Sequence, residues 1–143
     1  MNTAQEYALG RVVKLDNIGT QRSRMAKAIV LALNELVGET FPSKKACDIL
    51  AFVTLSLDAI SKTIDQSVLA WEKRGYWVKA DRFRLEWLWA RQSAENLRTA
   101  LLNDDWDGAE NIAGQVRQKL NNVKVSPHHR LGKPWVGAWE KLR

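Results

Sequence analysis

Apolar residues recur through most of the chain at the three- and four-residue spacing of α-helices, and no segment alternates with period two for long enough to form a strand. The longest regular stretch predicts a helix over about residues 44–74. Thr40 or Ser43 is expected to cap its start, and Gly75 to stop it. Its seam alternates four- and three-residue steps, a heptad spacing typical of helices packed side by side. The seam positions are Ala46, Leu50, Val53, Leu57, Ile60, Ile64, Ser67 and Trp71.

Similar stripes predict three more helices, which are expected to start near Arg22, Asp81 and Asp105. Gly38 is a suitable C-terminal stop for the first of them, and Asp81 could cap the second. The three stripes consist, in turn, of Met25, Ile29, Leu33 and Leu36; of Phe83, Trp87, Ala90, Ala94, Leu97 and Leu101; and of Trp106, Ala109, Ala113, Val116, Leu120 and Val123.

Short links between amphipathic helices make neighbours antiparallel, and this spacing is typical of helices that cross at about 20°. The sequence therefore predicts a single all-α domain over residues 1–143, an up-and-down antiparallel four-helix bundle at 20–125. An extra N-terminal helix is expected at 1–19, with Gly19 as its stop. A Trp-containing C-terminal tail at 126–143 completes the chain.

The run LLNDDWDGAEN resembles the turn inside a tetratricopeptide-type helical hairpin. The resemblance rests on Asp105 and Trp106, an acidic–aromatic pair, followed by the small residue Ala109. It is confined to this turn and is not repeated along the chain. It implies an antiparallel helical hairpin and no particular activity.

Half of the aromatic residues fall within residues 71–91, at the expected corner between the two longest helices. Trp71, Phe83 and Trp87 occupy seam positions and are expected in the core. Other large apolar residues here lie off the seams and form a candidate interaction patch, which the tail is expected to cover at its last three members. The patch consists of Tyr76, Trp77, Leu85, Leu88 and Trp89.

A net charge of +6 raises the question of an anionic partner. The predicted topology gathers cations at the 71–91 end of the bundle and acidic residues at the opposite end. Cations stabilise helix C-termini, which accounts for Lys73 and Arg74 but not for cations near helix N-termini. Exposed aromatics and arginines together can bind single-stranded nucleic acid. The candidate anion-binding end consists of Arg22, Arg24, Lys73, Arg74, Lys79, Arg82 and Arg84.

No catalytic, metal-binding or cofactor-binding residues are predicted. The single cysteine, Cys47, excludes an internal disulfide and the paired-cysteine zinc spacings. Its place on a first helical turn beside Lys44 could lower the thiol pKa, although a partly buried structural cysteine is the preferred interpretation. The acidic turn at 103–108 begins like a calcium loop, but Gly114 stands where that loop needs glutamate.

The segment His128-His129-Arg130 raises a metal or phosphate site as a hypothesis. Two adjacent histidines do not easily share one metal, and the chain has no further histidine. A solvated loop is therefore the preferred interpretation.

Neither a signal-peptide run nor an apolar segment near the ~20 residues of a membrane span is visible. The expectation is a cytoplasmic protein without a transmembrane segment. The first functional hypothesis is a non-enzymatic helical interaction module that self-associates or joins a larger complex. The alternative is a nucleic-acid-binding accessory protein that uses the basic end at 71–91. An enzyme whose site the sequence does not display is the third hypothesis, and a deep polar pocket would support it.

Overall fold

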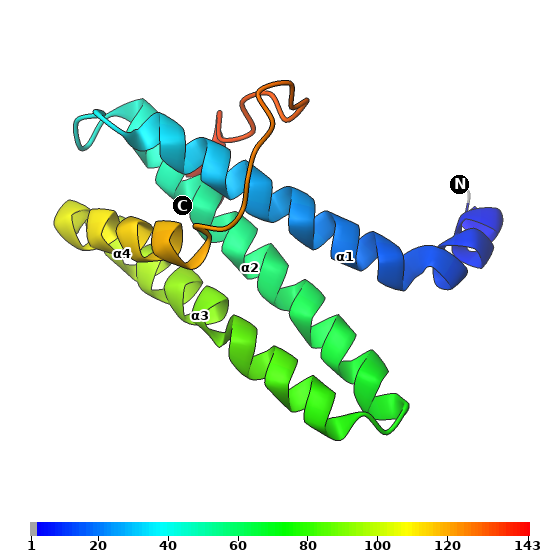
Figure 1. The fold of residues 1–143 in the computed structure, drawn as a ribbon. Helices are drawn as coiled ribbons and strands as arrows, with labels where there is room; N and C mark the ends of the chain where they lie inside the picture. The colour runs from blue at the N-terminus through cyan, green and yellow to red at the C-terminus, as the bar shows by residue number, and fades with distance from the viewer. Residues whose placement is uncertain (1–2) are drawn as a thin grey trace.

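The computed structural model describes the backbone of residues 3–143 and the side chains from Asn17 onward. Every regular element in this part of the chain is a helix, which confirms the all-α prediction. The helices, shown in Figure 1, are α1 (Thr3–Leu36), α2 (Lys44–Lys73), α3 (Trp77–Leu102), α4 (Trp106–Lys119) and α5 (Ala138–Leu142).

The predicted helix break at Gly19 is wrong, because α1 continues through this residue as one helix. A glycine inside a helix costs only about 0.5–1 kcal/mol relative to alanine. Packing on both sides of Gly19 outweighs that cost. Ile18 is buried just before it, and Arg22 hydrogen-bonds to α2 one turn later. Within the described backbone there is accordingly no separate N-terminal helix, since residues 3–19 belong to α1.

The central helix of the molecule is α2, which packs against α1, α3 and α5. Its predicted start is confirmed, since the amide of Ala46 donates to the hydroxyl of Ser43 over 3.0 Å. Its predicted stop is also confirmed: the helix ends at Lys73, and Gly75 adopts φ +83°. The seam predicted for this helix is buried except at Trp71, which is partly buried. Five of its members have no exposed surface at all: Ala46, Leu50, Val53, Leu57 and Ile60.

The predicted cap at Asp81 is wrong, because α3 begins four residues earlier, at Trp77. Tyr76 precedes the helix without a side-chain capping bond. The first turn is instead held by packing, since Ala80 is completely buried and its amide donates to the carbonyl of Tyr76 over 3.0 Å. Asp81 accepts a hydrogen bond from Arg84.

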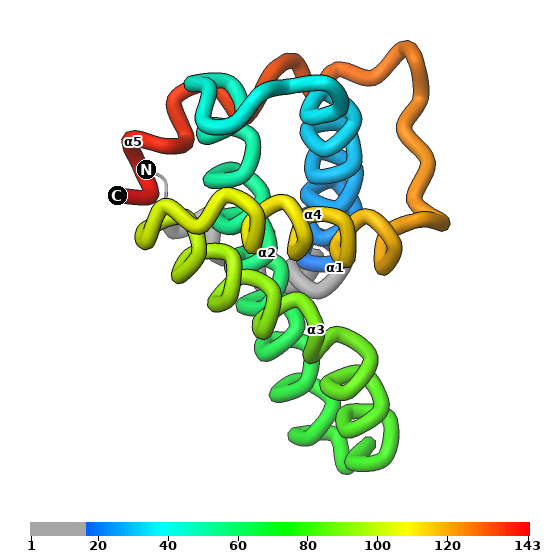
Figure 2. Tube along the Cα trace, turned by 90° about the vertical axis from the view of Figure 1, so that its left-hand side faces the viewer, coloured from blue at the N-terminus to red at the C-terminus, as the bar shows by residue number. Residues whose placement is uncertain are grey.

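Consecutive helices α1, α2 and α3 run antiparallel, whereas α4 crosses α1 steeply in Figure 2. The start of α4 is as predicted, with Asp105 accepting from the amide of Gly108 over 3.0 Å. The helix ends at Lys119, so the last two predicted seam residues, Leu120 and Val123, lie beyond it. Arg117 joins α4 to the end of α1 by donating to Asn34 Oδ1 over 2.9 Å. The lower part of the α2–α3 hairpin extends beyond α4 and α5 (Figure 2).

The tail does not cover the strip at Leu85, Leu88 and Trp89, contrary to the prediction. It packs instead against α2, where the buried carboxylate of Asp48 accepts hydrogen bonds from two tail amides. These are Gly137 N at 3.2 Å and Trp139 N at 3.0 Å. The first amides of a helix have no partner within it, so a carboxylate at this place on α2 determines where α5 docks.

The buried tail residues are Trp135, Ala138 and Leu142, which join the core shared by the other helices. Within the described chain, no helix combines the length and the apolarity needed to cross a membrane.

Candidate interaction surface

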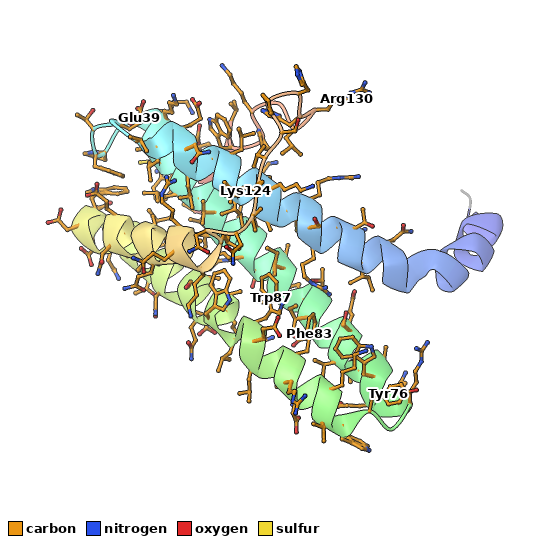
Figure 3. The ribbon with its side chains drawn as sticks, in the orientation of Figure 1. Glu39, Tyr76, Phe83, Trp87, Lys124 and Arg130 are labelled. Carbon is orange, nitrogen blue, oxygen red and sulfur yellow. The ribbon has the colours of Figure 1, made fainter. Side chains whose placement is uncertain are left out.

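The inner side of residues 71–91 is an aromatic cluster, as the seam positions predict. The rings of Trp71 and Phe83 meet edge to face with their centroids 4.8 Å apart. The guanidinium of Arg22 lies over Phe83 at 4.9 Å, and the ammonium of Lys79 lies over Trp71 at 4.7 Å. Figure 3 labels Phe83 within this cluster and Tyr76 at the tip of the hairpin. Two cations of the candidate anion-binding end therefore cover aromatic rings.

Arg22 makes further contacts that turn it toward α2. Its guanidinium donates to the hydroxyls of Thr63 and Ser67 over 3.1 and 2.9 Å. Burial lowers the pKa of Arg22 from its ordinary value. This arginine is consequently part of the α1–α2 contact and does not present its charge to an external ligand.

Arg84 is engaged by two carboxylates on the outer side of the hairpin. It donates to Glu72 over 2.8 Å and to Asp81 over 2.6 Å. These hydrogen bonds, first that to Glu72 and then that to Asp81, raise the pKa of Arg84. The remaining cations of the hairpin tip, Lys73, Arg74 and Arg82, are exposed, and no ion pair engages them among the residues whose side chains are described.

Four of the five residues in the candidate interaction patch are exposed: Tyr76, Trp77, Leu85 and Leu88. Trp89 is the exception. It is partly buried against the core, and its ring stacks on Trp87 at 5.7 Å. The structure adds an apolar residue that the sequence reasoning missed, Leu69 on α2, which is 57% exposed.

Two ion pairs between α2 and α3 frame Leu69 and Leu88. Arg91 donates to Asp65 over 2.6 Å, and Arg84 donates to Glu72 over 2.8 Å. Leu69 follows Asp65 by four residues and precedes Glu72 by three; Leu88 has the same relation to Arg84 and Arg91. Residues three and four apart share one side of a helix. We name this surface the hairpin face, and it consists of Asp65, Leu69, Glu72, Arg84, Leu85, Leu88 and Arg91.

The spacing of the hairpin face is the signal by which the sequence could have revealed Leu69. Charged residues that flank an apolar position at i−4 and i+3 are typical of the borders of a helix-packing seam. Glu72 and Arg84 side chains remain 23% and 46% exposed despite their ion pair. The outer surface of the hairpin is thus apolar at its centre and charged with both signs at its borders.

Cys47 is buried, and its environment has the opposite effect to the one raised from the sequence. Burial raises the pKa of its thiol, and the nearby carboxylates of Asp48 and Asp104 raise it further. Lys44 and Arg143 act in the lowering direction but have smaller effects. The preferred interpretation of Cys47 as a structural residue agrees with this environment.

The histidine segment lies in the loop between α4 and α5. The amide of His128 donates to the hydroxyl of Ser126 over 3.1 Å, and the amide of Leu131 donates to Nδ1 of His129 over 3.2 Å. Across the part of the chain that the structure describes, no three histidine, cysteine or acidic side chains gather closely enough to hold a metal ion. Comparisons with protein-family models, curated proteins and solved structures found no match to this chain.

Proposed function

We propose that this protein is a non-enzymatic helical interaction module that self-associates through the hairpin face. The observation that carries the proposal is the exposed pair Leu69 and Leu88, which lies between two ion pairs that both run from a carboxylate on α2 to an arginine on α3. An exposed apolar centre with a charged border is the usual anatomy of a protein interface.

The arrangement of charges on the hairpin face selects a second copy as the partner. With a two-fold axis parallel to the helices, α2 of one copy lies over α3 of the other. Asp65 of each copy then faces Arg91 of the other, and Glu72 faces Arg84, so every contact between charges is attractive. With the axis across the helices, Asp65 would face Glu72 and Arg84 would face Arg91, and every contact would be repulsive. A closed two-fold interface is self-complementary, and only the first orientation meets that condition.

The apolar centre sets the strength of this association. Leu69, Leu85 and Leu88 are 57%, 70% and 40% exposed. Covering the exposed part of each recovers about 1 kcal/mol, and six leucines from two copies therefore recover on the order of 6 kcal/mol before the costs of association. Since about 6 kcal/mol corresponds to a dissociation constant of about 40 µM and the costs of association weaken it further, the proposal is a weak dimer with a dissociation constant of about 0.1–1 mM.

The nucleic-acid hypothesis has less support, because three cations of the candidate end have intramolecular contacts. Arg22 bonds to α2, Lys79 covers Trp71, and Arg84 pairs with carboxylates. Self-association needs none of these cations to be released.

The test is sedimentation velocity of Leu88→Glu beside Leu102→Glu, over a concentration series from about 10 µM to about 1 mM. Both leucines are exposed on α3, but Leu102 lies at the far end of the helix from the hairpin tip. We expect Leu88→Glu to weaken the dimer at least tenfold and Leu102→Glu to leave it within twofold, with unchanged helical circular dichroism. A monomeric parent protein, or equal losses in both variants, would refute the proposal.

A charge exchange tests the orientation of the copies. The double variant Asp65→Arg/Arg91→Asp keeps an ion pair within each chain and, with the axis parallel to the helices, also between two copies of the variant. Mixed with the parent protein, it would place Arg91 of the parent against the new arginine at position 65. We therefore expect the variant to self-associate but not to form mixed dimers. Free mixing of the two proteins, measured by energy transfer between labelled copies, would exclude this orientation.

A further inference from the structure

A groove of about 920 Å³ lies between α1 and the loop that joins α4 to α5. Arg24 and Lys27 on α1 form one wall, and His129 and Arg130 in the loop form the other. In Figure 1 this loop passes beside α1 on its way to the tail, and Figure 3 labels Arg130 on the opposite side of the molecule from Tyr76. The groove is therefore separate from the hairpin face.

The groove collects positive charge from segments far apart in the sequence. The α1 residues Ser23, Arg24 and Lys27 lie within little more than one turn, so they face the groove together. The loop brings Arg130 toward them from the other side. Among the residues whose side chains the structure describes, from Asn17 onward, no carboxylate lines the groove, and none of its three cations forms an ion pair.

Neutral donors accompany these cations. Leu131 donates its amide hydrogen to Nδ1 of His129, so the neutral imidazole carries its own hydrogen on Nε2 and is a donor there. Ser126 accepts a hydrogen bond from the amide of His128, which leaves its hydroxyl hydrogen free to donate. The groove thus offers guanidinium, ammonium, imidazole and hydroxyl donors to one space.

We infer that this groove binds the pyrophosphate group of a small phosphorylated molecule. Guanidinium groups donate two parallel hydrogen bonds to phosphate oxygens, and such charge-assisted bonds are stronger than those between neutral groups. Like-charged side chains on two facing walls repel each other, and a multiply charged anion between them removes that repulsion. The volume lies within the range of small-molecule sites. This site is independent of the proposed self-association.

The experiment is isothermal titration of the full chain with inorganic pyrophosphate at low ionic strength. The groove variant is Arg24→Gln/Arg130→Gln. Its matched control is Arg74→Gln/Arg82→Gln, which removes the same charge from exposed arginines at the hairpin tip. We expect the groove variant to bind pyrophosphate at least tenfold more weakly, and the control to bind within twofold of the parent protein. If the groove variant loses its helical circular dichroism, Lys27→Gln against Lys73→Gln provides the same comparison.

A second titration, with a single-stranded oligothymidine, separates a small ligand from nucleic acid. Equal weakening of pyrophosphate binding in the groove and control variants would show that only net charge matters, and would overturn the inference. Absence of pyrophosphate binding by the parent protein would overturn it as well. Oligothymidine binding much tighter than pyrophosphate binding, lost in the groove variant and kept in the control, would also overturn it, in favour of a nucleic-acid strand as the occupant of the groove. Selective loss of pyrophosphate binding in the groove variant would support it.

Discussion

Replacement of Asp48 by asparagine is expected to loosen the C-terminal tail. The carboxylate is buried on α2 and accepts hydrogen bonds from the amides of Gly137 and Trp139. Gly137 precedes α5 and has no side chain to cap it, so Asp48 performs this capping from another helix. Asparagine keeps one acceptor oxygen, but its amide group turns hydrogens toward the second backbone donor.

The magnitude follows from the two bonds. A hydrogen bond to a charged group contributes about 1.5–3 kcal/mol, and the substitution removes one of them while weakening the other. Burying the neutral amide of asparagine costs less desolvation energy than burying a carboxylate, and this difference offsets part of the loss. The ion pair of Asp48 with Lys44, at 3.5 Å, adds little because the lysine is exposed. We expect a net loss of about 2 kcal/mol in the free energy of unfolding, which corresponds to a decrease of about 4–8 °C in Tm.

Urea unfolding followed by circular dichroism measures this change, and Asp58→Asn is the matched control. Asp58 lies on the same helix and pairs with Lys62 four residues later, as Lys44 pairs with Asp48, but it is not buried and contacts no tail amide. Its replacement should alter the free energy of unfolding by less than about 0.5 kcal/mol. The same two substitutions are then compared in a chain that ends at residue 134. If Asp48→Asn still costs about 2 kcal/mol there, its effect does not arise from the tail amides, and the reasoning is refuted.

Two further predictions concern α1 and Cys47. Gly19→Ala should raise the free energy of unfolding by about 0.5–1 kcal/mol, because α1 is helical through this position and an added Cβ would meet no atom within 4 Å beyond the adjacent residues and the backbone of its own helix. A loss of stability in urea titrations would indicate that the helix ends there. Burial raises the pKa of Cys47 above its ordinary value of about 8.5, so the folded state disfavours the thiolate. The stability that depends on this group is complete below pH ~8.5 and is lost as the pH rises through the folded-state pKa. The free energy of unfolding, measured with reductant between pH ~7.5 and ~10, should therefore fall more steeply with pH for the parent protein than for Cys47→Ala. Identical slopes would contradict a raised pKa of Cys47.

Periodicity predicted the helices well, because burial of one face is what selects these segments. The positions expected inside α2 are buried, apart from the partly buried Trp71, and the caps at Ser43 and Asp105 are formed. The errors occurred where local rules oppose tertiary contacts. Gly19 is a helix breaker by propensity, and Asp81 is a good cap by residue type. Packing around Ile18 and Ala80 decided both places against those local preferences.

The tail could not be positioned from the sequence for a different reason. Its apolar residues, among them Trp135 and Leu142, would fit any exposed apolar strip equally well. The docking position of the tail depends on Asp48, whose carboxylate accepts hydrogen bonds from amides at the start of α5, about ninety residues later in the sequence. Leu69 was missed because it lies off the α2 seam and looks like an isolated surface leucine. Its significance depends on Arg84, Leu88 and Arg91 of the next helix, which the fold brings to the same side.

The two ends of α2 have separate roles, and this makes the predictions independent. Asp48 and Asp65 are seventeen residues apart on one continuous helix, which corresponds to about 25 Å. This distance exceeds the Debye length of about 8–10 Å at physiological ionic strength, so a charge change at the tail contact does not alter the ion pairs of the hairpin face electrostatically. The tail is held at Asp48, on the first part of α2, whereas the hairpin face begins at Asp65, which pairs with Arg91 of α3. A variant that releases the tail should therefore lose stability without losing self-association, and Leu88→Glu should do the reverse. These opposite effects are expected because α2 is long enough to separate the tail contact at Asp48 from the hairpin face.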